Sequence, residues 1–199
     1  FTTGKPQAWS ALGLTAELPV LLVFGGSRGA RSINRALIAA LPDLLPRCQV
    51  VHATGNLDWA ESQAAVTGLK LAPELAARYH GQPYLNNMTQ ALVAADLVVA
   101  RAGAATLGEF PAARLPAILS PYPYAGQHQE ANAAYLADRG AARVIPDGEL
   151  AAKLKGTVLD LLSRPERLQA MSEAAGSLAR PHAADNIADE LIRLASGVT

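Results

Sequence analysis

Short apolar runs alternate along the chain with segments whose apolar residues recur every three or four positions. Short continuous apolar runs are typical of strands buried on both faces of a parallel sheet, and the longer period is typical of helices with one buried face. The runs predict strands over Val20–Phe24, Gln49–Ala53, Gln82–Leu85, Leu97–Ala100, Ala117–Ser120 and Ala142–Ile145. The periodic segments predict helices over Ala30–Ala40, Asp58–Ala65, Met88–Ala94, Ala104–Ala113, Gln127–Asp138, Leu150–Leu162, Pro165–Leu178 and His182–Leu194.

Predicted strands and helices alternate up to residue 149, after which only helices are predicted. This order predicts an α/β domain, a Rossmann-like doubly wound parallel sheet of about six strands with helices on both faces. We expect this domain to occupy residues 19–199. Residues 1–18 are expected to form a lead-in segment, with a short helix over Trp9–Leu14 that ends at Gly13.

Composition narrows the functional classes. The chain has 199 residues, with 17 Lys and Arg and 17 Asp and Glu, so its net charge is zero. A zero net charge argues against nucleic-acid binding, which needs a basic surface. The single cysteine, Cys48, can form neither a disulfide nor a cysteine zinc site within the chain and fits a reducing, cytosolic setting. The apolar runs are far shorter than a membrane span, and no signal peptide is visible. Because the chain begins at Phe1, we expect a processed chain or a fragment.

A glycine-rich turn, Gly25-Gly26-Ser27-Arg28-Gly29, joins the first strand to the next helix. Glycines allow a tight turn and a close approach to a ligand, and a helix start offers unpaired N–H groups and the positive end of the dipole. Together they predict an anion site, most often for phosphate, although a tight turn without a ligand uses the same residues. The spacing differs from the dinucleotide pattern G-x-G-x-x-G, and the G-K-[ST] of a P-loop is absent.

Two further predicted helices begin with polar residues after apolar strands. Glu109 follows the strand that ends at Ala100, where a carboxylate can accept two hydrogen bonds from a ribose diol or simply complement the helix dipole. His128 follows the strand over Ala117–Ser120. Its side chain could contact the same ligand, or it could simply be an exposed or helix-capping histidine. All three helix starts are expected at the carboxyl edge of the sheet, where open α/β proteins bind ligands.

No catalytic constellation accompanies these motifs. The sequence contains no D-x-D pair for a nucleotide-bound metal, no cluster of histidine and cysteine, and no G-x-S-x-G elbow. We therefore expect neither a metal nor a cofactor.

Five segments together carry a family resemblance. They are Gly25-Gly26-Ser27-Arg28-Gly29-Ala30 with Ile33-Asn34, Tyr84-Leu85-Asn86-Asn87-Met88, residues 95–109, Pro116-Ala117-Ile118-Leu119, and His128-Gln129-Glu130-Ala131-Asn132-Ala133. Their order and spacing closely resemble the C-terminal domain of the MurG family of cell-wall enzymes, which belongs to glycosyltransferase family 28 and has the GT-B fold. The resemblance runs from about Pro19 to Leu194, nearly the whole chain.

The resemblance implies the donor-binding half of an enzyme with two Rossmann-like domains. It implies that the backbone of Gly25 and Gly26 and the side chain of Ser27 meet the diphosphate of UDP-GlcNAc. Ala105 and Thr106 would approach the phosphate as well.

The remaining ligand contacts follow from the same resemblance. The backbone of Leu85 would pair with uracil, with Met88 packed beside the base, and Glu109 would hold the ribose hydroxyls. His128 and Gln129 would contact the GlcNAc hydroxyls, although His128 stands where some members carry Gln.

At the level of the whole enzyme, the resemblance implies inverting transfer of GlcNAc to lipid I, which forms lipid II in peptidoglycan synthesis. The acceptor domain, with the family's candidate base and membrane-facing patch, is missing from the chain, and its Asn-Pro-x-Arg segment is not found in residues 1–18. We therefore expect this fragment to be inactive alone, and the full enzyme to be peripheral at the cytoplasmic face of the membrane. The alternatives are another GT-B sugar transferase, a GT-B-like sugar-nucleotide epimerase, and a non-catalytic nucleotide-binding module.

Overall fold

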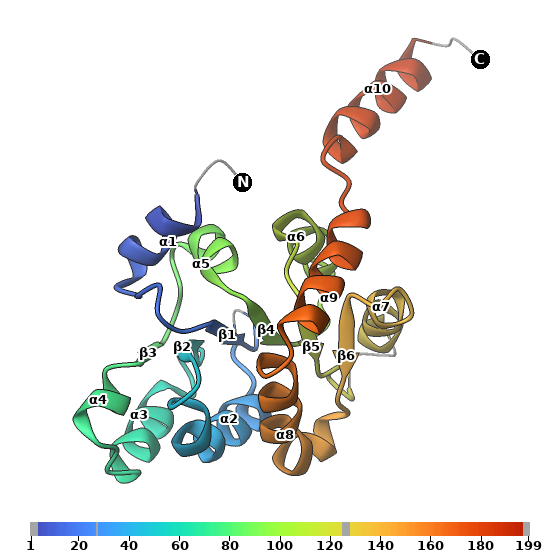
Figure 1. Ribbon diagram of the computed structural model, residues 1–199. Helices are drawn as coiled ribbons and strands as arrows, with labels where there is room; N and C mark the ends of the chain where they lie inside the picture. Colours follow the sequence, from blue (N-terminus) through green and yellow to red (C-terminus); the bar gives the residue numbers. More distant parts are fainter. Residues whose placement is uncertain (1–3, 27, 125–127, 197–199) are drawn as a thin grey trace.

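A six-stranded parallel sheet forms the centre of the molecule, with helices on both of its faces (Figure 1). The computed structural model describes residues 4–26, 28–124 and 128–196. The strands are β1 (Val20–Phe24), β2 (Gln49–Ala53), β3 (Tyr79–Gln82), β4 (Leu97–Ala100), β5 (Ala117–Leu119) and β6 (Ala142–Val144). Their order, β3-β2-β1-β4-β5-β6, and their parallel pairing confirm the predicted doubly wound α/β fold.

The chain changes direction across the sheet between β1 and β4. From β1 it moves outward to β2 and β3, then returns to β4 on the other side of β1 and continues to β5 and β6. Leu21 pairs with Leu97 and Phe24 pairs with Ala100, so β1 and β4 end level with each other. Such a switch point opens a crevice at the carboxyl ends of the two strands, where doubly wound proteins bind ligands.

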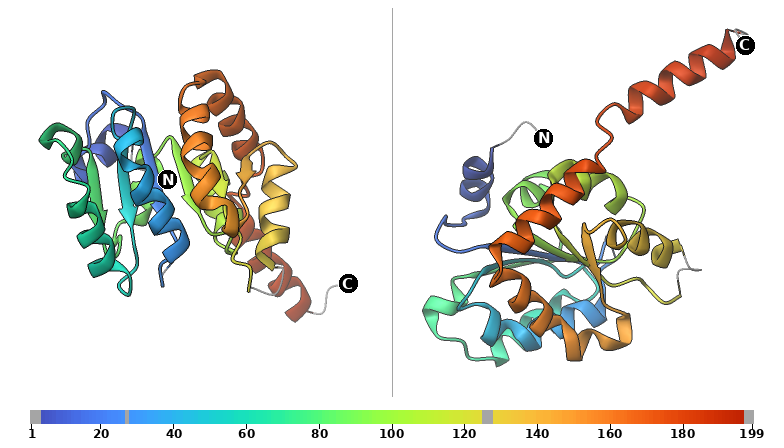
Figure 2. Two further views of the ribbon diagram at one scale, coloured as in Figure 1. Left: turned by 90° about the horizontal axis from the view of Figure 1, so that it is seen from below. Right: turned by 45° about the vertical axis from the view of Figure 1, so that its right-hand side comes forward.

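Helices form a layer on each face of the sheet. They are α1 (Lys5–Leu12), α2 (Arg31–Leu44), α3 (Trp59–Gly68), α4 (Pro73–Ala76), α5 (Met88–Ala94), α6 (Thr106–Ala113), α7 (His128–Ala137), α8 (Leu150–Leu162), α9 (Pro165–Ser177) and α10 (Ala183–Ala195), with a 3₁₀ helix, η1 (Asp147–Glu149), before α8. In the right-hand view of Figure 2, α2 and α8 lie below the sheet and α6 lies above it.

Successive residues of one strand enter opposite cores. Leu21 and Val23 of β1 belong to the core that contains α2 and α8, whereas Val20 and Leu22 belong to the core that contains α5 and α6. Side chains alternate across a strand, so a strand with a core on each face buries every side chain and is mostly apolar, as β1 is. This double burial explains why the central strands are visible in the sequence as continuous apolar runs.

The edge strand β3 was the one strand misplaced by the sequence pattern. The prediction of a strand over Gln82–Leu85 was wrong, because the strand that pairs with β2 is Tyr79–Gln82. Its residues are only half-buried or exposed, so no apolar run marks it. Pro83, which has no N–H to donate, follows its last residue.

Other boundaries differ from the prediction by a few residues. Helix α2 continues past Pro42 to Leu44, and α6 begins at Thr106 rather than Ala104. The strands β5 and β6 each end one residue earlier than predicted, and neither α4 nor η1 was predicted.

The lead-in segment packs against the domain. Helix α1 begins at Lys5, earlier than the predicted start at Trp9, and is followed by Gly13, whose left-handed φ of 68° closes it. The indole Nε1 of Trp9 donates a hydrogen bond of 3.0 Å to the carbonyl of Ala94 in α5. Ala8 is completely buried, so α1 contributes to the core.

Helix α10 projects away from the rest of the molecule (Figure 1). Its apolar residues Ile187, Leu191, Ile192 and Leu194 are each more than 60% exposed. Within the described residues, no helix combines the length and the apolar character needed to cross a bilayer.

Candidate functional site

The glycine turn after β1 contains two closely packed glycines and one that faces open space. A Cβ on Gly25 would lie 2.3 Å from the backbone nitrogen of Ala30, and a Cβ on Gly29 would lie 2.2 Å from the carbonyl oxygen of Thr54. Gly26 has a φ of +89°, and an added Cβ would meet no atom of the described residues within 4 Å. Gly25 and Gly29 are therefore required by packing, whereas Gly26 adopts a left-handed conformation beside unfilled space. Ser27 lies outside the described residues.

A chain of buried polar side chains fixes the first turns of α2. Asn34 donates from Nδ2 to the carbonyl of Thr54 at 2.9 Å, and its Oδ1 lies 2.9 Å from Nε2 of His52. Nδ1 of His52 lies 2.9 Å from the hydroxyl of Tyr79. Because the Asn34 oxygen can only accept, His52 carries its proton on Nε2 and accepts from Tyr79. Burial lowers the pKa of His52 to about 3 and raises the pKa of Tyr79 to about 12.

An ion pair extends this series of hydrogen-bonded side chains from Asn34 to the surface. Asp58 receives a hydrogen bond of 3.2 Å from Asn34, and Arg31 donates to Asp58 from Nε at 3.0 Å and from Nη2 at 2.9 Å. Arg31 is the first residue of α2, so this pair anchors the helix start that follows the glycine turn.

The loop after β4 presents a second helix start at the same edge. Among the described residues, the backbone N–H groups of Ala104 and Ala105 have no acceptor. The buried Thr106 hydroxyl donates to the carbonyl of Gly103 at 2.6 Å, so it is already engaged. Glu109 is exposed, and no described residue pairs with its carboxylate.

Leu85 and Met88 lie in the connection from β3 to α5. The Leu85 side chain is buried, and no described residue accepts a hydrogen bond from its backbone N–H. Contrary to the prediction, Leu85 stands in this connection rather than at the end of a strand. Met88 begins α5, is half-buried and packs against the core on that face of the sheet.

His128 and Gln129 begin α7, after β5. The His128 side chain is exposed. Oε1 of Gln129 accepts a hydrogen bond of 2.9 Å from the backbone N–H of Tyr122, which ties the start of α7 to the segment that follows β5. Asn132, one turn further along, donates to the carbonyl of Ala102 at 2.9 Å and so ties α7 to the loop after β4.

Sequence reasoning missed an ionic cluster at this edge, formed by Ser32, Arg101 and Asp147. Nη1 of Arg101 lies 2.6 Å from Oδ1 of Asp147, and Nη2 of Arg101 donates to the hydroxyl of Ser32 at 2.8 Å. The one signal in the sequence was Arg101 itself, a charged residue directly after a buried strand.

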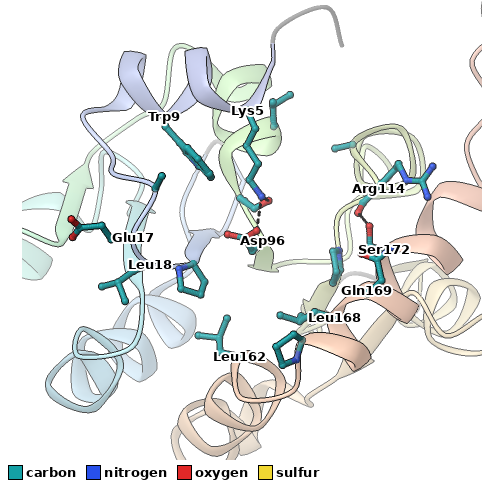
Figure 3. A pocket seen from close by; sticks show the side chains of 17 residues that line it. Lys5, Trp9, Glu17, Leu18, Asp96, Arg114, Leu162, Leu168, Gln169 and Ser172 are labelled. Carbon is teal, nitrogen blue, oxygen red and sulfur yellow. Dashed lines mark hydrogen bonds and ion pairs between the residues drawn. The ribbon is translucent and has the colours of Figure 1, made fainter.

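A concave region of about 580 Å³ lies at the opposite, amino edge of the sheet (Figure 3). Pro19, Asp96 and Pro116, which line it, precede β1, β4 and β5. Lys5 and Asp96, which also line it, pair with each other. This hollow is therefore separate from the predicted site. No group of ligating side chains suited to a metal occurs among the described residues.

Comparison with known proteins identifies the family. The model of the glycosyltransferase family 28 C-terminal domain matches residues 20–189. The chain belongs to glycosyltransferase family 28. This finding confirms the resemblance seen in the sequence, and the glycine turn and both later helix starts fall within the family 28 domain.

Relatives of this family 28 domain have one name in common. Proteins from Roseiflexus sp. and Chlorobium phaeobacteroides are each 45% identical to the chain, over 94% and 95% of its length. Both are named UDP-N-acetylglucosamine--N-acetylmuramyl-(pentapeptide) pyrophosphoryl-undecaprenol N-acetylglucosamine transferase. The chain covers 47% and 50% of their lengths, so it spans about half of the curated relatives it matches.

Solved structures agree with the family 28 assignment. Acinetobacter baumannii MurG superimposes with a TM-score of 0.77 at 29% identity, over 94% of this chain and 53% of that one. A putative UDP-N-acetylglucosamine 2-epimerase from Listeria monocytogenes gives a TM-score of 0.69 at 16% identity, over 96% of this chain and 48% of that one. The second likeness shows the fold alone.

Proposed function

We propose that the chain is the donor-binding domain of an inverting glycosyltransferase that transfers GlcNAc from UDP-GlcNAc to lipid I, forming lipid II. The observation that carries this proposal is the 45% identity, over nearly the whole chain, to relatives named for that transfer. The positions of the three helix starts at the carboxyl edge support it.

The diphosphate is assigned to the crevice between β1 and β4. The turn at Gly26 follows β1 and the start of α6 follows β4, and the N–H groups of Ala104 and Ala105, which no described residue accepts from, suit an anion. Gly25 supports the turn, and Ser27 is assigned a hydroxyl contact by family resemblance. For Thr106 we propose a contact through its position at the helix start, since its hydroxyl is engaged with Gly103.

The nucleoside is assigned to the connection before α5 and to α6. The N–H of Leu85, which has no acceptor among the described residues, suits the edge of uracil, and Met88 stands at the start of the adjoining helix. The Glu109 carboxylate, which is exposed and pairs with no described residue, suits the ribose diol. His128 and Gln129 begin α7 beyond β5, which is the direction in which the sugar would extend.

Chemistry in this proposal is a single displacement. An acceptor hydroxyl attacks the anomeric carbon of GlcNAc, the bond to the UDP oxygen breaks, and the hydroxyl proton passes to a base outside this chain. Negative charge develops on the leaving diphosphate, and the helix N–H groups oriented toward it stabilise that charge. The other half of the enzyme would also hold the acceptor and contact the cytoplasmic face of the membrane.

Calorimetric titration of the purified chain tests the proposal. We expect saturable binding of UDP-GlcNAc, weaker binding of its C4 epimer UDP-GalNAc, and much weaker binding of CDP. We also expect no GlcNAc transfer to lipid I by the chain alone. Equal affinity for CDP and UDP, or no nucleotide binding at all, would contradict the proposal.

A further inference from the structure

Arg101 joins four separate elements at the carboxyl edge. It follows β4, and its guanidinium reaches Ser32 in the first turn of α2 and Asp147 at the start of η1. Nη1 also donates to the carbonyl of Ser120 at 3.1 Å and lies 3.3 Å from the carbonyl of Pro121, both directly after β5. The guanidinium carbon lies 5.3 Å from the ring centre of Tyr122.

The contacts of this cluster are mutual and largely shielded from water. The hydroxyl of Ser32 donates to Oδ1 of Asp147 at 2.6 Å while it accepts from Arg101, so the three side chains form a closed triangle. Only 11% of the Arg101 side chain and 24% of the Asp147 side chain are exposed. Charge-assisted hydrogen bonds in such surroundings are strong and directional, so the cluster resists changes in the distance between its elements.

We propose that Arg101 is a positioning residue that sets the spacing between the diphosphate end and the sugar end of the donor site. Its contact with Ser32 holds the α2 start. Its contacts with Ser120 and Pro121 hold the backbone next to Tyr122, whose N–H donates to Gln129 at the start of α7. This inference rests on the proposed function, which assigns those two regions to the two ends of UDP-GlcNAc. Only a ligand that spans both ends depends on their spacing.

The Arg31–Asp58 pair provides a matched control. It also anchors the start of α2 through a guanidinium and a carboxylate, but it reaches the loop after β2 and not the loop after β5. We expect its loss to perturb the diphosphate end alone.

The test is calorimetric titration of the chain and its variants with UDP and with UDP-GlcNAc. The variants are Arg101→Lys, Asp147→Asn, their double mutant, and Ser32→Ala, which removes one hydroxyl and is the least disruptive to folding. We expect Arg101→Lys and Asp147→Asn to weaken UDP-GlcNAc binding by about tenfold more than UDP binding, the scale of one charge-assisted hydrogen bond. The double mutant should lose little more than either single variant, because both break one cluster.

Two comparisons decide the outcome. Ser32→Ala should show the same selective loss on a smaller scale, whereas Arg31→Lys should weaken both ligands equally. Equal losses for UDP and UDP-GlcNAc in the Arg101, Asp147 and Ser32 variants would overturn the positioning role while leaving the proposed function intact. Failure of the unaltered chain to bind UDP would instead overturn the proposed function, and the inference with it.

Discussion

The side-chain oxygen of Asn34 lies 2.9 Å from Nε2 of His52, and both residues are almost completely buried. The hydrogen bond couples the helix after the glycine turn to the neighbouring strand β2. Burial keeps the His52 ring neutral, so Nε2 donates to Asn34 and Nδ1 accepts from the Tyr79 hydroxyl.

Acid should therefore destabilise the fold through His52. Its pKa is lowered to about 3 by burial, whereas an unfolded histidine binds a proton near pH 6.5. Between these values the unfolded state binds more protons, so the free energy of unfolding falls as the pH falls, by up to about 1.4 kcal/mol for each pH unit. Urea unfolding at several pH values between 7.5 and 4 measures how steeply the free energy of unfolding depends on pH.

The pH dependence of the unfolding free energy is compared among the unaltered protein, His52→Gln and His182→Gln. His52→Gln should flatten the dependence over that pH range, whatever its stability at pH 7.5. His182 is mostly exposed, so His182→Gln is the control for the loss of a histidine outside the buried network. Equal slopes in all three proteins would show that His52 titrates normally in the folded state.

Gly25 and Gly26 should respond differently to substitution. Gly25→Ala forces a Cβ against the backbone of Ala30 and should lower the melting temperature. The Cβ of Gly26→Val meets no described atom within 4 Å, so the folding cost that the structure shows is that of the left-handed φ, about 1–2 kcal/mol. Its Cβ branch occupies the space assigned to the diphosphate, so UDP binding should fall far more than uridine binding. Unchanged UDP affinity in Gly26→Val would mean that the turn is only structural.

Removing the Glu109 carboxylate should weaken UDP binding. A lost charge-assisted hydrogen bond costs about 1.5–3 kcal/mol, so Glu109→Gln should bind UDP at least tenfold more weakly by calorimetry. The loss should disappear for a 2′,3′-dideoxyribose analogue, which offers no diol. Glu130→Gln is the control, because Glu130 also lies in the first turn of a helix at this edge. If the two variants lost equal UDP affinity, Glu109 would act only by complementing the helix dipole and would not bind the ribose.

The lead-in segment should contribute to stability. Trp9→Phe removes the donor to the Ala94 carbonyl and should lower the free energy of unfolding by about 1 kcal/mol in urea titration. Trp59→Phe is the control, since no described residue accepts a hydrogen bond from the Trp59 indole. A loss no larger than that of Trp59→Phe would show that α1 is not held by this contact.

Sequence alone predicted most of the central sheet because burial on both faces leaves a continuous apolar run. The bounds of β1 and β4 were predicted correctly for this reason, and those of β2 were also correct although it includes the buried polar residues Gln49 and His52. The edge strand β3 was misplaced, since Tyr79, His80 and Gln82 carry polar groups that a half-exposed strand tolerates. The Arg101 cluster escaped notice because its hydrogen bonds join residues 69 and 115 positions apart. Local periodicity carries no information on such pairs. The ligand roles of the candidate residues remain predictions.

Amide chemical-shift mapping of the ¹⁵N-labelled chain during titration with UDP-GlcNAc tests the central claim most directly. That claim places the nucleotide at the carboxyl edge of the sheet, opposite the hollow in Figure 3. We predict saturable shifts at Gly25, Gly26, Leu85 and Ala105, and none at Glu17, Ala95 or Gln169, which line the amino-edge hollow. Shifts confined to the residues of that hollow, with the carboxyl edge unaffected, would contradict the account.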